Sequence, residues 1–416
     1  MSEPAVKSDG FAATASLSDT TSSKPSESEK PAVLIVGGLG YIGRFLALYI
    51  HKNNLGGEVR LVDKQLPQLA WLAPEFAEAC SQGKFMQADA SKEQSLSRIF
   101  TLPSGREFDY VFNCGGETHY SQDDSVYSAR SLSLTTVLAT ECARRKIPAY
   151  IEFSTGLVYK PPTSSTIASG GCKENASTDP WLKLAKYKLL AEEALEKIRR
   201  EGETKEGPGK GLRYAVLRLA HVYGEYDVGY LARGLCLARV YQSKNEKMKW
   251  LYSKDLRQAT IHVSDVCSAA WLAAKWCASL PSTPSLPLQD RIFNIVDKGS
   301  TSQQTLSTII AAIFNIQTGF QNALINAFAK FNLENVVDDV NEDVLQPWAD
   351  LISKKGIARP GPISPFMEKE LLTDKDLCMS GERAEKVLGW RPQKEKMSEE
   401  DVRGVVASYE RIGWWP

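Results

Sequence analysis

The sequence has no long apolar run and no excess of charge of either sign. Fifty lysines and arginines balance fifty aspartates and glutamates. No overall field would therefore attract nucleic acid or an anionic membrane, and we expect neither as a partner. No stretch of about 18 consecutive apolar residues is present, which argues against a membrane-spanning helix. The chain also begins without the charged and apolar segments of a secretion signal, so we expect a cytoplasmic protein.

Metal-binding patterns are missing as well. The eight cysteines include no Cys-x-x-Cys pair, and no spacing of cysteines and histidines is of the kind that encloses zinc. We therefore expect reduced thiols and no metal site. The chain has 416 residues, 43% of them hydrophobic, and can bury a full core. It fits one large α/β domain with an additional lobe.

Three regions are expected along the chain. Residues 1–30 are rich in Ser, Thr, Glu, Pro and Lys and poor in large apolar side chains, which predicts a disordered tail. Residues 31–220 alternate apolar strands with helical patterns, which predicts a doubly wound parallel sheet of the Rossmann type. Residues 221–416 predict a smaller, mostly helical substrate-binding lobe, with some segments returning to the sheet domain. Helical patterns at about 67–80 and 301–330 predict two further helices.

A glycine-rich turn, GGLGYIG, follows the first apolar strand directly and opens the first helix. Gly37 permits a tight turn, Gly40 lets the backbone approach a pyrophosphate, and Gly43 lets the helix pack closely on the strand. The amino end of the helix would then face the phosphate charge. The alternative is a plain turn between strand and helix. The residues expected to contact a dinucleotide are Gly37, Gly38, Gly40, Tyr41, Ile42 and Gly43.

Acidic residues end the second and third strands. Asp63 lies twenty residues after Gly43, where a carboxylate would accept hydrogen bonds from the adenine ribose hydroxyls. A 2'-phosphate would be repelled there, so we expect NAD rather than NADP, although Arg44 and Lys64 weaken that preference. Asp89 is placed either to meet the adenine amino group or to cap the next helix. The turn and Asp63 together predict a dinucleotide site.

With these residues the sequence resembles the extended short-chain dehydrogenases, also called the NAD-dependent epimerase/dehydratase family. GGLGYIG matches the family's Gly-x-x-Gly-x-x-Gly turn, and the resemblance extends in the family's order over roughly residues 31–415. The further matching segments are NCGGETH (113–119), STGLVY (154–159), LRLAHVYG (217–224), RQATIHVSDVCSAA (257–270) and LGWRP (388–392). The resemblance implies a Rossmann fold, an NAD site, a small-molecule substrate such as a nucleotide sugar and, as is frequent in the family, a homodimer.

The resemblance also implies roles for individual residues. Thr155 takes the place of the family's catalytic Ser or Thr, which hydrogen-bonds the reacting oxygen; the alternative is a hydroxyl that ties down a strand end. Lys188 precedes Glu192 by four residues, as in the family, and would bind the nicotinamide ribose; the alternative is a solvated helix lysine. Arg218 and Arg257 are candidates for binding a substrate phosphate, or else for surface ion pairs.

The family's catalytic tyrosine is missing. In the family, this Tyr lies four residues before the Lys on the same helix face, and it exchanges the proton that accompanies hydride transfer. Four residues before Lys188 stands Leu184, which has no proton to exchange. Tyr187 directly precedes Lys188, about 100° away around a helix, and the register that makes Tyr187 the acid puts Ala191 in place of the lysine. A second departure is Ser131, where the family usually has Asn.

Another residue would then have to supply the proton. ETH at 117–119 resembles the Glu-Ser-His of sugar-nucleotide dehydratases in this family, and His119 would lie at the carboxyl end of the fourth strand, where ligands bind in open sheets. Those dehydratases have an Asp-Glu pair where this chain has Gly156 and Leu157, which argues against a standard 4,6-dehydratase. The candidate donors are His119, Tyr120, Tyr159 and Tyr187.

Three functions remain open from the sequence. The first is an NAD-dependent epimerase/dehydratase-like oxidoreductase with a rearranged proton donor, acting on a nucleotide sugar or a similar hydroxyl or keto substrate; Thr155, Lys188 and His119 favour it. The second is a catalytically inactive NAD(P)-binding regulator or structural subunit, which Leu184 favours. The third is a steroid- or flavonoid-type reductase. We prefer the first, because an intact turn, ribose acid, threonine and lobe are more than a scaffold needs.

Overall fold

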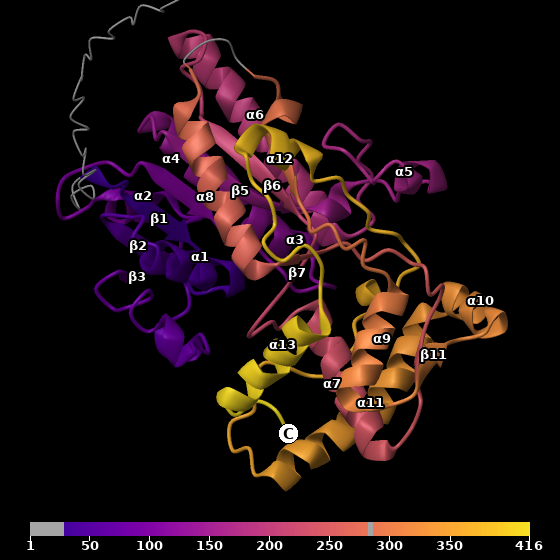
Figure 1. Ribbon diagram of the computed structural model, residues 1–416. Coiled ribbons are helices and arrows are strands. Elements are labelled where there is room, and N and C mark those ends of the chain that lie inside the picture. The colour runs from indigo at the N-terminus through magenta and orange to yellow at the C-terminus, as the bar shows by residue number, and fades with distance from the viewer. Residues whose placement is uncertain (1–28, 282–285) are drawn as a thin grey trace, which may run out of the picture.

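A seven-stranded parallel sheet forms the centre of the molecule (Figure 1). The computed structural model describes residues 29–281 and 286–416, and most of the predicted tail at 1–30 lies outside them. The strands follow the order β10-β6-β5-β4-β1-β2-β3, which confirms the predicted doubly wound fold. They are β1 (Val33–Val36), β2 (Val59–Asp63), β3 (Phe85–Gln87), β4 (Tyr110–Asn113), β5 (Ala149–Thr155), β6 (Tyr214–Leu219) and β10 (Ile292–Ile295).

The central strands are buried on both faces, as their nearly continuous apolar runs require. Because all neighbouring strands are parallel, their carboxyl ends lie at one edge of the sheet. The register sets Asn113 of β4 beside Glu152 of β5, and Thr155 of β5 beside Leu219 of β6. The segments that follow β1, β4, β5 and β6 therefore meet at the same edge.

Helices cover both faces of the sheet (Figure 1). On one face α1 (Tyr41–Lys52) packs beside α8 (Val263–Ser279), and α12 (Glu382–Leu388) lies next to α8. On the other face lie α2 (Glu93–Phe100), α4 (Ser133–Arg144) and α6 (Lys183–Glu206). Each face has its own apolar core, because the side chains of successive strand residues point to opposite sides.

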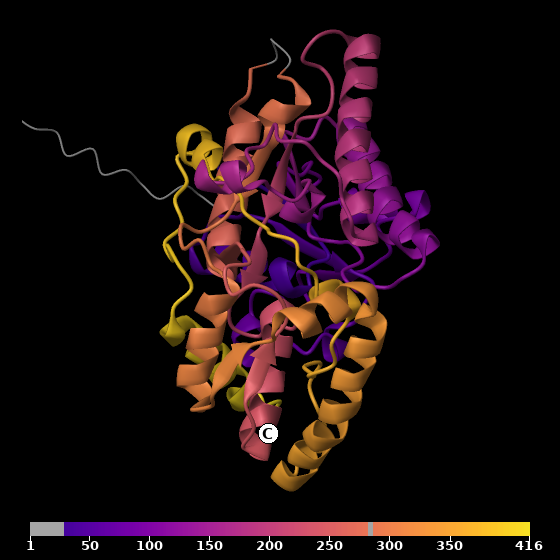
Figure 2. The ribbon, with the colours of Figure 1, turned by 90° about the vertical axis from the view of Figure 1, so that its right-hand side faces the viewer.

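The remaining helices form a lobe at one end of the molecule, below the sheet in Figure 2. It has its own apolar core, to which Trp348, Trp414 and Trp415 contribute. Its helices are α7 (Tyr230–Lys244), α9 (Gln303–Phe314), α10 (Ala323–Phe331), α11 (Leu333–Lys355) and α13 (Glu399–Arg411). Two short pairs of parallel strands lie outside the central sheet. In one, β7 (His221–Tyr223) pairs with β9 (Thr260–His262), and in the other, β8 (Met248–Trp250) pairs with β11 (Thr318–Phe320). The boundary predicted at residue 220 stays a prediction.

Short helical turns complete the described structure. They are η2 (Pro67–Leu69), η3 (Pro74–Phe76), α3 (Asp124–Tyr127), the π-helical turn η4 (Ser128–Leu132), η5 (Gly156–Val158), α5 (Ser164–Ala168), η6 (Leu288–Arg291) and η7 (Lys369–Leu371). Among the described residues, no helix has the length and apolar character needed to cross a membrane.

Two of the predicted helices are wrong. Residues 67–80 form η2 and η3 in place of one α-helix; a proline begins each of these turns, and the ring fixes φ and removes an N–H donor. The helix predicted at 301–330 is divided into α9, β11 and α10. Asn315 ends α9 in the left-handed conformation, with φ +50°, which stops the helix after Phe314.

Candidate functional site

The glycine turn after β1 is shaped by close backbone contacts. Gly37 has φ +70°, and a Cβ atom there would lie 2.7 Å from the backbone nitrogen of Gly115, which follows β4. A Cβ on Gly43 would lie 2.2 Å from the carbonyl oxygen of Gly37. Both positions therefore need glycine, and the turn brings the chain after β1 against the chain after β4. Among the described residues, no side chain caps the amino end of α1 at Gly40, which suits an anion-binding turn.

Asp63 lies beside this turn. Its carboxylate accepts hydrogen bonds from the backbone N–H of Leu39 (3.1 Å) and of Gln65 (3.1 Å). The carboxylate is thus fixed next to the residues that would hold the pyrophosphate, at the end of β2. Tyr41 and Ile42 form the first turn of α1. The Tyr41 hydroxyl is buried and has no hydrogen-bond partner among the described residues.

The cations near Asp63 already have partners. The Arg44 guanidinium donates to the backbone oxygens of Leu39 (2.6 Å), Ala70 (2.9 Å) and Trp71 (3.2 Å). The Lys64 ammonium lies 3.3 Å from the Asp89 carboxylate. Arg44 is thus held by backbone acceptors, whereas Lys64 is half exposed and has a single carboxylate partner.

Asp89 has internal partners in addition to Lys64. The backbone N–H and the hydroxyl of Ser91 donate to it at 3.0 and 2.6 Å. Partial burial opposes ionisation, but these hydrogen bonds outweigh it and lower the pKa of Asp89. The contacts are those of a turn before α2 and not of a helix cap, because among the described residues no side chain caps α2 at Lys92. The predicted contact with adenine stays a prediction.

Lys188 is the residue of α6 that faces the carboxyl edge of the sheet. Its side chain is only 11% exposed, and its Nζ lies 3.2 Å from Oε1 of Glu152 and 3.5 Å from the carbonyl oxygen of Gly115. A Cβ atom on Gly116, where φ is +145°, would lie 3.3 Å from the same Nζ. Lys188 is therefore not a solvated surface lysine, since its ammonium lies directly under the segment that follows β4.

Glu152 is fully buried in the middle of β5 and has partners on both carboxylate oxygens. Oε2 accepts hydrogen bonds from the Asn113 amide (2.7 Å) and the Tyr150 hydroxyl (2.8 Å), while Oε1 faces Lys188. The Asn113 amide also donates to the Thr135 hydroxyl of α4. A charged pair thus lies inside the sheet domain with both carboxylate oxygens and two of the three ammonium hydrogens in hydrogen bonds, and such pairing is what burial of charge requires.

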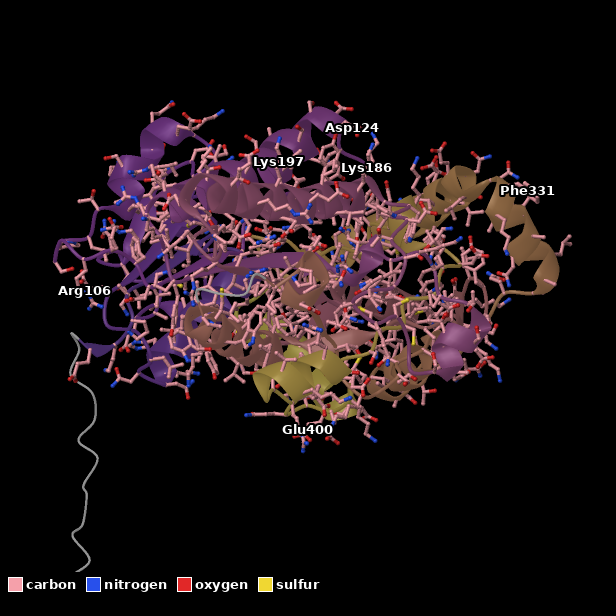
Figure 3. All side chains as sticks on the ribbon, turned by 90° about the horizontal axis from the view of Figure 1, so that it is seen from above. Arg106, Asp124, Lys186, Lys197, Phe331 and Glu400 are labelled. Carbon is pink, nitrogen blue, oxygen red and sulfur yellow. The ribbon has the colours of Figure 1, made fainter. Side chains whose placement is uncertain are left out.

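Tyr187 points away from this cluster. Its hydroxyl donates to Asp124 of α3 at 3.1 Å, and its ring stacks on Tyr127. Asp124 also pairs with Lys183, and Figure 3 shows Asp124 and Lys186 at the outer surface of the molecule. The structure does not bring Tyr187 together with Lys188, and Leu184 stays in the position of the family's tyrosine.

His119 lies after β4 within a separate cluster of charges. Its Nδ1 is 2.6 Å from Oε1 of the buried Glu117, whose other oxygen accepts from Arg130 at 2.5 Å. Burial opposes ionisation of Glu117, but hydrogen bonds from His119 and Arg130 outweigh it and lower its pKa. The His119 ring is 74% exposed. Ser131 lies in the π-helical turn η4, and its hydroxyl accepts from the Glu117 N–H.

Thr155 ends β5 at the same edge. Its hydroxyl oxygen accepts a hydrogen bond from the N–H of Leu157 and so caps η5, the structural alternative expected from the sequence. This bond uses a lone pair and leaves the hydroxyl hydrogen for another acceptor. Tyr159 is held elsewhere, because its buried hydroxyl donates to Asn294 at 2.7 Å.

The two arginines proposed for a substrate phosphate lie in different surroundings. Arg218 is buried, donates to Glu192 at 2.6 Å and stacks on Tyr159, so its guanidinium serves an internal ion pair. Arg257 lines an open pocket of about 530 Å3 between α5, α10 and the segment before β9. Its guanidinium donates to the carbonyl oxygen of Ser300. Arg257 alone retains a position from which it could meet a substrate.

Sequence reasoning missed two residues near the candidate site. Glu152 was detectable as a charge within an otherwise apolar central strand. His221 follows β6, stacks on Tyr230 at 4.9 Å between ring centroids, and is partly exposed. Burial lowers its pKa to about 4, although Gln258 opposes the shift, so its ring is neutral at pH 7. Its place at the start of β7, two residues after β6 ends, was the available signal.

These features define an α/β protein of the Rossmann type with a built dinucleotide turn. The chain belongs to the NAD dependent epimerase/dehydratase family, whose sequence model matches residues 33–295. The cofactor expected from Asp63 is the one that the family's description names. In the described part of the chain, no group of His, Cys, Asp and Glu side chains could hold a metal ion.

Several solved structures have a similar fold. Pal from Bacillus thuringiensis is 16% identical with a TM-score of 0.62, and the match covers 92% of this chain and 98% of that one. The UDP-glucose 4-epimerase of Thermotoga maritima, solved with UDP-glucose, is 18% identical with a TM-score of 0.60, covering 91% and 99%. The Bordetella bronchiseptica enzyme WbmG, solved with NAD and UDP, is 15% identical with a TM-score of 0.59, covering 93% and 96%. At these identities the likeness concerns the fold. A comparison with curated proteins found no match.

Proposed function

We propose that the chain binds NAD across the carboxyl edge of its central sheet and oxidises or reduces a hydroxyl- or keto-bearing carbon of a nucleotide sugar or similar compound. The adenosine half would lie on the glycine turn and Asp63, and the nicotinamide half over Lys188. Bound NAD supplies the acceptor or donor of hydride. The observation that carries the proposal is Lys188, whose ammonium is held beneath the segment that follows β4, the same segment that the glycine turn contacts at Gly115.

Lys188 and the residues around it would bind the ribose, bind the reacting oxygen and transfer the proton. The Lys188 ammonium has three hydrogens, of which Glu152 and Gly115 take two, and the third is available for a ribose hydroxyl. The Thr155 hydroxyl would bind the reacting oxygen of the substrate. The proton would come from His119 or Tyr120, which follow β4 at the same edge, since Leu184 cannot exchange one.

A nucleotide sugar is supported as substrate by the family and by the neighbours solved with UDP-glucose or UDP. The pocket beside Arg257 would take the part of the substrate farthest from NAD. Met379 and Leu377 pack against Gly156, next to Thr155, because a Cβ atom on Gly156 would contact both side chains. Asp376 lines the pocket and precedes Leu377 directly.

A second function, an NAD-binding protein without turnover, is favoured by two observations. Tyr187 is hydrogen-bonded to Asp124 on the outer surface, and Leu184 replaces the family's proton donor. Such a protein would respond to the cofactor or hold it for a partner.

Calorimetric titration of the protein with NAD and with NADP tests the cofactor. We expect tighter binding of NAD, and tenfold tighter binding of NADP would contradict the role given to Asp63. A crystal structure with NAD then separates the two functions. A protic side chain within about 3.5 Å of the nicotinamide C4 region beside Thr155 supports an oxidoreductase. A site lined there only by Leu184 and other apolar groups supports the binding protein.

A further inference from the structure

Glu152 and Lys188 form an ion pair whose net charge is zero at the place where the nicotinamide is proposed to lie. In a doubly wound sheet, the half built on the first strands holds one nucleotide of a dinucleotide and the half built on the later strands holds the other. Here the glycine turn and Asp63 belong to β1 and β2, whereas Lys188 approaches the ends of β4 and β5. The pair therefore lies under the nicotinamide half.

The two oxidation states of the cofactor differ in charge at that half. The nicotinamide ring of NAD+ carries one positive charge, and the ring of NADH is neutral. A lone ammonium beneath the ring would repel NAD+ and leave NADH unaffected, and the repulsion would be strong in a site shielded from water. The Glu152 carboxylate, 3.2 Å from the ammonium, cancels most of this field.

Hydrogen bonds and the sheet backbone hold the Glu152 side chain in place. Asn113 and Tyr150 both donate to the oxygen that does not face Lys188, so three donors orient the buried carboxylate. Its backbone is fixed within the sheet, where Glu152 aligns with Asn113. The carboxylate is thus a fixed counter-charge to Lys188.

We propose that Glu152 is a positioning residue that, through Lys188, sets the preference of the site between NAD+ and NADH. The inference rests on the proposed function, since it needs the dinucleotide to bind at this edge. With Glu152 present, the lysine can hold the ribose without penalising the oxidised ring. The chain thereby retains affinity for NAD+ although it lacks the tyrosine whose proton chemistry the lysine serves elsewhere in the family.

The test compares dissociation constants for NAD+ and NADH in the full chain and in Glu152→Gln, by calorimetry and by NADH fluorescence. In the variant we expect Kd for NAD+ to rise and the ratio of Kd for NAD+ to Kd for NADH to increase roughly tenfold, from the Coulomb energy of one unscreened charge. A tenfold increase corresponds to a bound two-electron potential about 30 mV more positive. In Lys188→Met/Glu152→Gln, which has neither charge, the ratio should return to within about twofold of the original.

Controls separate this effect from loss of structure. Glu196→Gln removes a different buried carboxylate, one on α6 that pairs with Arg199 and Tyr214. This variant should leave the ratio of Kd for NAD+ to Kd for NADH unchanged. If the role of Glu152 were merely structural, Glu152→Gln would weaken the binding of NAD+ and of NADH equally. An unchanged ratio of the two dissociation constants would therefore overturn the inference, although the proposal that the chain binds NAD would stand. If Glu152→Gln does not fold, Glu152→Met removes the same charge and is expected to give the same rise. If the unaltered protein binds neither cofactor, the proposed function fails and the inference with it.

Discussion

At the scale of single residues, Lys188 differs from its neighbours on α6 in what surrounds the ammonium. Lys183 and Lys186 are exposed, whereas Lys188 has a carboxylate and a carbonyl as acceptors and little contact with solvent. An ammonium held in this way loses little further freedom when a ligand hydroxyl becomes its third acceptor. The side chain is already ordered in the folded protein, so most of the free energy of the new hydrogen bond contributes to binding.

Lys188→Met is therefore expected to weaken NAD binding by about tenfold or more, because the ribose loses a hydrogen bond from a charged donor, worth about 1.5–3 kcal/mol. Calorimetry measures the change. Lys186→Met is the matched control, since Lys186 lies on the same helix at the outer surface of the molecule (Figure 3). The affinity of this variant for NAD should equal that of the unaltered protein. Equal affinities of the two variants would return Lys188 to a structural role.

At the scale of elements, the sequence predicts the sheet well because its strands are buried on both faces. A strand with no solvent-facing side reads as a short apolar run followed by a turn, and VLIV before GGLGYIG is such a run. The predicted parallel sheet is observed, and VLIV forms its strand β1. The turn itself is recognisable because Gly37 and Gly43 have no room for a Cβ atom.

The failures at this scale have local or non-local causes. Pro67 and Pro74 divide a helical pattern, and their effect could have been read from the sequence. The interruption of the 301–330 pattern by β11 depends on pairing with β8, some seventy residues earlier, which no local pattern shows. Likewise, the partner of Lys188 could not be predicted, because Glu152 meets it only after β5 and α6 pack together.

The ion pair between β6 and α6 offers a test of how these elements are joined. Arg218 and Glu192 are both buried, and Glu192 also accepts from the Ser154 hydroxyl of β5 at 2.5 Å. Arg218→Met leaves Glu192 buried without its counter-ion, and we expect the free energy of unfolding to fall by about 3–5 kcal/mol. Urea denaturation measures the loss.

Two further variants complete this test. Arg218→Met/Glu192→Met should recover most of the stability, because an apolar pair of similar size is often as stable as a buried ion pair. Arg200→Met removes an exposed guanidinium from Glu196, which keeps Arg199 and Tyr214 as partners, and should cost less than about 1 kcal/mol. A loss as small as this in Arg218→Met would mean that the pair is accessible to water.

At the scale of the whole molecule, the segment after β7 connects the sheet domain to the last helix of the lobe. The N–H of Tyr226 donates to Ser408 of α13, and the hydroxyl of Tyr409 donates to the carbonyl oxygen of Asp227. The Tyr226 hydroxyl in turn donates to Glu75 of the sheet domain at 3.0 Å. The segment after β7 thus contacts both the sheet domain and the lobe. A charged side chain buried in this segment therefore affects the stability of the whole molecule.

Asp227 carries that charge, and its side chain accepts from the N–H groups of Gly229 and Ala232. Burial outweighs these bonds and raises the pKa of Asp227 to about 6. Its pKa in the unfolded chain is about 3.9, so the folded protein binds the proton more tightly than the unfolded chain does. The stabilisation from protonation is complete below about pH 4 and is lost as the pH rises through about 6.

Asp227→Asn removes this titration, so the free energies of unfolding of the unaltered protein and of the variant should depend differently on pH. The free energy of unfolding of the unaltered protein, relative to Asp227→Asn, should fall by about 2–3 kcal/mol between pH 4 and pH 7. Urea denaturation of both proteins at a series of pH values measures the difference, and groups common to both cancel. Asp350→Asn, at an exposed position on α11, controls for the loss of one negative charge. A difference that stays constant across this range would show that the Asp227 carboxyl is solvated, and that the segment joining the two parts of the molecule is open to water.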